Sequence, residues 1–189
     1  VRSRRQRQMC IRDRFIADIG IQSIGAVSVG LYPTNPSSEV EYLLSHSESK
    51  ILFAEDQEQV DKALEVIDQL PKLEKIVYFE DKGLYSYDHP KLMRFDEFLD
   101  LGKSEYESFP EYVDQQLENL EDDDVAFLVY TSGTTGKPKG SMITHGNIAW
   151  VATQIPNFSL VENVKSKEPQ FLSYLPLCHI FGRLSLIHI

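Results

Sequence analysis

The most constraining feature of the sequence is a strand-like apolar segment that leads directly into a loop of glycines, hydroxyls and lysines. Asp124 to Tyr130 is a nearly continuous apolar run, as expected in a sheet covered on both faces. The residues from Tyr130 to Gly140 then read Tyr-Thr-Ser-Gly-Thr-Thr-Gly-Lys-Pro-Lys-Gly. Because ligands of open α/β sheets bind beyond the carboxyl ends of the strands, this order predicts a ligand-binding loop on an α/β fold.

Each residue type in this loop has a use at a polyphosphate. Glycines permit backbone bends that bring N–H groups close to an anion. Short hydroxyls can contact phosphate oxygens or Mg²⁺, and lysines add positive charge. The glycines are Gly133, Gly136 and Gly140, the hydroxyls are those of Thr131, Ser132, Thr134 and Thr135, and the lysines are Lys137 and Lys139.

Two better-known phosphate loops do not fit this segment. A P-loop requires Gly-x-x-x-x-Gly-Lys followed by Ser or Thr, whereas here the glycines are three residues apart and Pro138 follows Lys137. The Gly-x-Gly-x-x-Gly pattern of nicotinamide-binding folds is also absent. A surface loop with no ligand is the plain alternative, and the position directly after a buried strand argues against it.

The rest of the chain alternates between helical and strand patterns, which predicts parallel βαβ units. We therefore expect an α/β fold, a mostly parallel sheet with flanking helices. The expected helices are 16–30, a segment from a Ser38–Glu41 capping box to about Ser47, 57–70 capped by Asp56, 109–120, and one capped by Thr144 or Asn147 to about Ile155. The expected strands are 50–54, 75–79, 124–130 and 170–175, and 80–102 is expected to be a polar surface excursion.

Composition limits the function classes. The 189 residues carry a net charge of −10, which argues against nucleic-acid binding through a basic surface. Cys10 and Cys178 have no metal-ligand spacing, so we expect no disulfide framework and a cytoplasmic location. The acidic run Glu121 to Asp124 could trap a metal, but a solvated loop before a strand is the favoured interpretation.

The two ends of the chain differ from its middle. Six arginines lie within residues 1–14, and only Arg94 and Arg183 follow. A basic targeting arm is one interpretation, but we favour a foreign or disordered flank, because the next segment starts in mid-helix without a start pattern. For the same reason we interpret residues 185–189 as a foreign tail.

At the loop the chain resembles a known superfamily. Tyr130 to Gly140 is similar to the signature loop of the adenylate-forming enzymes, which include acyl-CoA synthetases, luciferases and peptide-synthetase adenylation domains. Ser141 to Asn147, where the family loop runs on into a helix, and Ser173 to Gly182 also resemble superfamily motifs. Ile16 to Pro36 resembles the helix and Tyr-Pro-Thr-Asn-Pro turn of long-chain fatty acyl-CoA synthetases.

This resemblance implies a partial large N-terminal AMP-binding domain over residues 15–184, without the family's C-terminal domain. The implied activity is that of an AMP-forming fatty acyl-CoA synthetase, a long-chain-fatty-acid–CoA ligase that uses ATP, Mg²⁺ and coenzyme A. Thr131 to Gly140 would hold the β- and γ-phosphates, Thr131 would lie near Mg²⁺, and His179 would lie beside the acyl and adenylate pocket. From the residues alone, a hydrogen-bonded core histidine is the other interpretation of His179.

The family's adenine and ribose motifs and its lysine-bearing final domain lie beyond this sequence, so we expect the chain alone to be inactive. One alternative is a non-catalytic nucleotide-binding or interaction module of the same fold, and another is a synthetase for a different carboxylic acid. The expected partners are a fatty acid and nucleotides, with no nucleic acid. Peripheral membrane association of the full-length protein stays open.

Overall fold

A computed structural model describes residues 4–131 and 136–154, with side chains from Arg14 onward. The chain divides into two compact units. Unit 1 comprises residues 1–20 and 33–115, and unit 2 comprises residues 21–32 and 116–189. Among the described residues, each unit contains its own three-stranded sheet. Ser132 to Thr135, the expected strand 170–175 and His179 lie outside the described residues.

Unit 1 is built on a fully parallel sheet. Its strands are β2 (Ile51–Ala54), β3 (Lys75–Tyr78) and β4 (Leu92–Arg94), in the order β2-β3-β4. Helix α2 (Ser37–His46) precedes the sheet, α3 (Gln57–Glu65) and a short 3₁₀ turn (Ile67–Gln69) connect β2 to β3, and α4 (Phe95–Ser108) follows β4. The core side chains Val60, Ile76 and Val77 are fully buried. The predicted βαβ unit is therefore confirmed.

Helix starts in unit 1 follow local chemistry. The Asp56 carboxylate accepts a hydrogen bond from the Gln59 backbone N–H at 3.2 Å, which confirms the predicted cap of α3. The predicted capping box at Ser38 is wrong. Helix α2 begins at Ser37, one residue before the expected start. The residue before it is Pro36, which is extended with a φ of −71° and makes no side-chain cap, because its ring has no hydrogen-bond acceptor.

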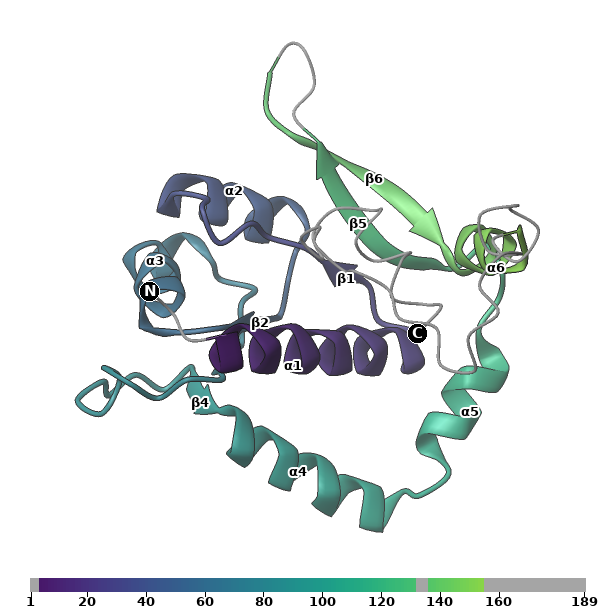
Figure 1. Ribbon diagram of the computed structural model, residues 1–189, viewed down its shortest axis with the longest axis horizontal. Helices are drawn as coiled ribbons and strands as arrows, with labels where there is room; N and C mark the ends of the chain where they lie inside the picture. The colour runs from purple at the N-terminus through teal and green to yellow at the C-terminus, as the bar shows by residue number, and fades with distance from the viewer. Residues whose placement is uncertain (1–3, 132–135, 155–189) are drawn as a thin grey trace. The chain divides into compact units, whose positions relative to one another are not determined.

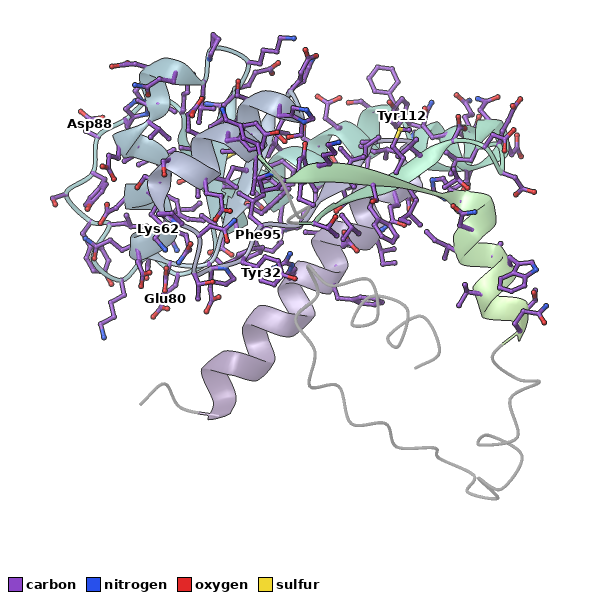
Figure 2. The ribbon with its side chains drawn as sticks, turned by 90° about the horizontal axis from the view of Figure 1, so that it is seen from above. Tyr32, Lys62, Glu80, Asp88, Phe95 and Tyr112 are labelled. Atoms are coloured by element: carbon purple, nitrogen blue, oxygen red, sulfur yellow. The ribbon has the colours of Figure 1, made fainter. Side chains whose placement is uncertain are left out.

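The Tyr-Pro-Thr-Asn-Pro turn is held from α3. Lys62, labelled in Figure 2, donates from its ammonium to the Pro33 carbonyl at 2.7 Å and to the Glu58 carboxylate at 2.9 Å. The Gln59 side chain donates to the same carbonyl at 3.3 Å. Asn35 within the turn is buried. The sequence predicted a turn here, and the structure adds the helix that fixes it.

Four phenylalanines attach α4 to the sheet of unit 1. The Phe79 and Phe95 rings lie 4.5 Å apart between centroids, and Phe98 meets Phe53 edge-on at 5.4 Å (Phe95 is labelled in Figure 2). Such pairs add stabilisation beyond their buried area. This packing explains why the expected polar excursion over residues 80–102 is wrong in part, because the segment also supplies β4 and the first half of α4.

Unit 2 contains the sheet on which the predicted loop lies. Its strands are β1 (Ser28–Val29), β5 (Val125–Thr131) and β6 (Lys139–Thr144), in the order β1-β5-β6. Strand β1 pairs with β5 in parallel and β6 pairs with it antiparallel. Helix α6 (His145–Gln154) follows β6, and Ile143 and Ile148 pack on a core of Ala126, Phe127 and Val129.

In the part of the chain that the structure describes, three of the four strand pairings are parallel, which confirms the predicted mostly parallel α/β class. Helix α5 (Tyr112–Asn119) falls within the helix expected over residues 109–120.

The first helix differs from the prediction. Helix α1 (Arg4–Ser23) ends seven residues before the expected end at Gly30. Gly25 has a φ of +69°, a left-handed conformation that favours glycine, and its N–H donates to the Gln22 carbonyl. The helix stops at this turn, and Ser28 and Val29 then pair with Phe127 and Leu128. The foreign origin of residues 1–14 stays a prediction.

Candidate functional site

The predicted phosphate-binding loop is the tip of the β5–β6 hairpin. Strand β5 ends at Thr131 and β6 begins at Lys139, and these two residues are Cα partners across the hairpin. Figure 1 shows the two strands side by side with α6 following β6. The strand between the loop and α6 was not predicted, and pairing with the buried β5 holds Lys139 to Thr144 in this extended conformation.

Close to the loop, the hairpin pairs a large side chain with a glycine. Tyr130 and Gly140 are Cα partners, so their side-chain positions lie on the same face of the hairpin. A Cβ added to Gly140 would lie 3.2 Å from Tyr130 Cζ and within 3.5 Å of both Cε atoms. The Tyr130 ring therefore lies over the Gly140 backbone, and an alanine there would crowd it.

The structure describes five of the nine predicted loop residues. Thr131, Gly136, Lys137 and Lys139 are exposed, and Gly140 is half-buried. Gly136 has a φ of +115°, which a residue with a side chain rarely adopts. Within the described part of the chain, the Lys139 ammonium makes no ion pair or hydrogen bond, so its charge is available to an anion. Thr131 and Lys139 together place a hydroxyl residue and a cation at the two sides of the loop.

Helix α6 is tied to the turn that precedes β5. The His145 backbone N–H donates to the Asp124 carbonyl at 2.9 Å, and the Gly146 N–H donates to the Asp122 carbonyl at 2.8 Å. Thr144 and Asn147 then cap the helix reciprocally, because each side-chain oxygen accepts from the other backbone N–H at 3.2 Å. Both predicted cap residues are confirmed as one capping box. The exit of β6 is thereby fixed against the entry of β5.

The acidic run before β5 forms a turn. The Glu121 N–H donates to the Asp124 carboxylate at 2.9 Å, and the Asp124 N–H donates to the Glu121 carbonyl at 3.0 Å. No group of three or more His, Cys, Asp or Glu in the described residues could hold a metal ion. The run therefore has a structural role in the turn. Sequence reasoning did not foresee its contacts with α6, since two of the acceptors are backbone carbonyls that any residue would supply.

The described donors fit a magnesium ion that arrives with a polyphosphate. Mg²⁺ prefers oxygen ligands and keeps several waters, and in nucleotide sites phosphate oxygens supply much of its coordination. The Thr131 hydroxyl is exposed at the end of β5, where it could supply one protein oxygen. The described residues supply no carboxylate cluster of the kind that holds a resident ion tightly. A single hydroxyl ligand is compatible with a Mg²⁺ ion that is bound mainly by ATP.

Two of the hollows among the described residues lie away from the loop and are lined by none of its residues. One, of about 430 Å³, runs along a single face of α4 at Phe98, Gly102 and Tyr106. The other, of about 320 Å³, lies at the amino end of β5, beside Gly25, Leu120 and Val125. Because ligands of parallel sheets bind at the carboxyl ends of strands, we give more weight to the hairpin tip than to either hollow.

Comparison with known proteins identifies the family. Residues 12–189 match the model of the AMP-binding enzyme family, described as "AMP-binding enzyme". The chain belongs to this family. It is 36% identical over 170 residues to the long-chain-fatty-acid–CoA ligase ACSBG2 of Xenopus laevis and 33% identical over 177 residues to that of Homo sapiens. These matches cover 90% of this chain but only 22% and 24% of the relatives, so the chain spans about a quarter of their length.

Solved structures support the assignment to the AMP-binding enzymes. The anthranilate CoA ligase AuaEII in complex with anthranoyl-AMP is 26% identical, with a TM-score of 0.52, and the match covers 73% of this chain and 24% of that protein. ATP-bound MatB from Rhodopseudomonas palustris has a TM-score of 0.61 over 93% of this chain and 30% of its own. At 16% identity, MatB shows the shared fold alone.

Among the described residues, no helix combines the length and the apolar character that crossing a bilayer requires.

Proposed function

We propose that this chain is part of an AMP-forming fatty acyl-CoA ligase, and that the β5–β6 hairpin holds the β- and γ-phosphates of ATP. The observation that carries the proposal is the position of the loop. It begins at the carboxyl end of a buried strand that is flanked by a parallel and an antiparallel neighbour. The assigned phosphate-binding residues are Thr131, Ser132, Gly133, Thr134, Thr135, Gly136, Lys137, Lys139 and Gly140.

The reaction we propose for the full-length protein has two stages. A fatty acid carboxylate attacks the α-phosphate of ATP, pyrophosphate leaves, and an acyl-adenylate forms. The thiol of coenzyme A then displaces AMP and yields the thioester. Lys139 and the loop N–H groups would stabilise negative charge on the departing pyrophosphate, which is the electrostatic form of catalysis. Bound Mg²⁺, with Thr131 near it, would supply further charge neutralisation.

The acid substrate is the less constrained part of the proposal. The vertebrate relatives are named for long-chain fatty acids, and these names support a fatty acid here. The likeness to an anthranilate CoA ligase supports an aromatic acid as the second candidate. We also propose that His179 lies beside the acyl and adenylate pocket. A panel of carboxylic acids offered to the full-length protein would separate them.

We further propose that residues 15–184 are a partial N-terminal AMP-binding domain and that the 189-residue chain alone does not form thioesters. Holding only the outer phosphates does not position the α-phosphate against a carboxylate, and positioning supplies much of the rate enhancement in such reactions. Thioester formation by the purified chain above the uncatalysed background would contradict this proposal.

The deciding experiment measures ATP–pyrophosphate exchange and ATP·Mg²⁺ affinity in the full-length protein. Replacing Lys139 by Ala should weaken ATP binding by roughly 10- to 100-fold, since a charge-assisted hydrogen bond contributes on the order of 1.5–3 kcal/mol. Lys103→Ala is the matched control, because that exposed lysine pairs with Asp100 on α4. Unchanged ATP affinity in Lys139→Ala would refute the phosphate assignment. Binding of ATP by the full-length protein without exchange would favour the non-catalytic module.

A further inference from the structure

The Tyr130–Gly140 pair lies one step from the loop on both strands. The next Cα partners toward the tip are Thr131 and Lys139, and the loop begins immediately beyond them. On its own face of the hairpin, the pair is therefore the last cross-strand contact that can fix the distance and twist between the strands before the loop.

The contact at this layer is close and one-sided. The Tyr130 ring carbons lie 3.2 to 3.5 Å from the position a Gly140 Cβ would take. Since Gly140 has no side chain, the ring can lie across the neighbouring strand, and cross-strand aromatic contacts of this kind stabilise a sheet. On the opposite face Phe127 and Val129 are buried in the core, so β5 itself has little freedom to move when the ring is displaced.

The neighbouring pair on the same face of the hairpin is not packed in this way. Leu128 and Met142 are the Cα partners two residues farther from the loop, and they occupy the same face. Met142 is 68% exposed, so its side chain is not buried against the neighbouring strand as the Tyr130–Gly140 contact is.

We propose that Tyr130 is a positioning residue for phosphate binding, whose ring, seated over Gly140, holds Thr131 and Lys139 at the separation that an ATP polyphosphate requires. The inference rests on the proposed function of the hairpin. The ring touches no phosphate in this role. It acts by keeping the two sides of the loop in one geometry, so that the N–H groups and cation do not have to be ordered when the anion binds.

The test is a double-mutant cycle in the full-length protein, with dissociation constants for ATP·Mg²⁺ and for AMP as readouts. Gly140→Ala should weaken ATP binding by about tenfold while AMP binding stays within about twofold, because AMP has no β- or γ-phosphate. Tyr130→Ala should cause a similar loss, and adding Gly140→Ala to it should cost little more, since the added methyl then meets no ring. Tyr130→Phe keeps the ring and should bind ATP like the wild type.

Met142→Ala is the matched control and should leave both affinities unchanged. A general loss of structure would lower ATP and AMP binding together, and that result would overturn the positioning role. Equal ATP affinity in wild type, Gly140→Ala and Tyr130→Ala would overturn it as well, while leaving the phosphate assignment intact. A wild-type protein that binds no ATP would overturn the proposed function itself, so the two failures are distinguishable.

Discussion

Gly146 and Gly102 are both helical glycines, and the structure predicts opposite effects when each is replaced by alanine. A Cβ at Gly102, within α4, meets nothing within 4 Å. A Cβ at Gly146, in the first turn of α6, would lie 3.0 Å from the Asp122 carbonyl oxygen and 3.1 Å from Asp122 Cβ. The same oxygen accepts the Gly146 N–H at 2.8 Å, so it cannot retreat without lengthening that bond.

The magnitudes follow from these distances. Gly102→Ala should raise the free energy of unfolding by about 0.5–1 kcal/mol, because alanine reduces the entropy lost on helix formation. Gly146→Ala gains at most the same amount. Two effects lower its free energy of unfolding. The weakened hydrogen bond costs about 1 kcal/mol, and overpacking costs about 1–3 kcal/mol. The expected net result at Gly146 is a loss of about 1–3.5 kcal/mol.

Urea denaturation measures both variants. The chain has a single tryptophan, Trp150, which lies on α6, so its fluorescence reports on the helix whose first turn contains Gly146. Far-UV circular dichroism follows Gly102→Ala. An unchanged slope against urea concentration would show that the variants differ in stability rather than in the unfolded state. If Gly146→Ala is as stable as the wild type or more so, the close approach to Asp122 does not constrain this position and the reasoning fails.

Three further predictions concern the cap, the core and pH. Asp56→Ala should lower stability by about 1 kcal/mol by removing the cap of α3, while Asp56→Asn should retain most of it, both by urea denaturation. Phe127→Ala should cost about 3–5 kcal/mol, because the side chain is 1% exposed; a loss under 1 kcal/mol would contradict the described core of unit 2. The Lys72 ammonium is hydrogen-bonded to the Glu48 carboxylate and lowers the pKa of Glu48 from 4.5. The stabilisation by this ion pair is therefore fully present above pH 4.5 and is lost as the pH falls further. The stability difference between wild type and Lys72→Met should therefore shrink below pH 4.5, and a difference that grows there would contradict the assignment.

The helices and strands that could be predicted from the sequence are those determined by residues close together along the chain. Strands β2, β3 and β5 are runs of apolar residues, and the caps at Asp56 and Thr144 depend on neighbours within three residues. Hydrophobic pattern and capping chemistry act over such distances, so they can be seen without tertiary contacts.

The elements that were missed depend on partners far along the chain or on pairing. Strand β1 has two residues, and its pairing with β5 makes it a strand. Strand β6 contains Lys139, Gly140 and Ser141, which have little strand preference, and it is extended because β5 offers it a ladder. For the site, the sequence predicted the loop and its residue types. It could not predict that Tyr130 and Gly140 face each other, because that requires the register of a hairpin.

The two strands that pair with β5 differ in how many residues separate them from β5 along the chain. Strand β6 returns within a few residues of the end of β5, whereas Ser28 and Phe127 are about 100 residues apart along the chain. Short-range closures cost less entropy and form sooner during folding. The β5–β6 pairing can therefore form before its sheet is complete, and the pairing of β1 with β5 becomes the late event that commits unit 2 to its final fold.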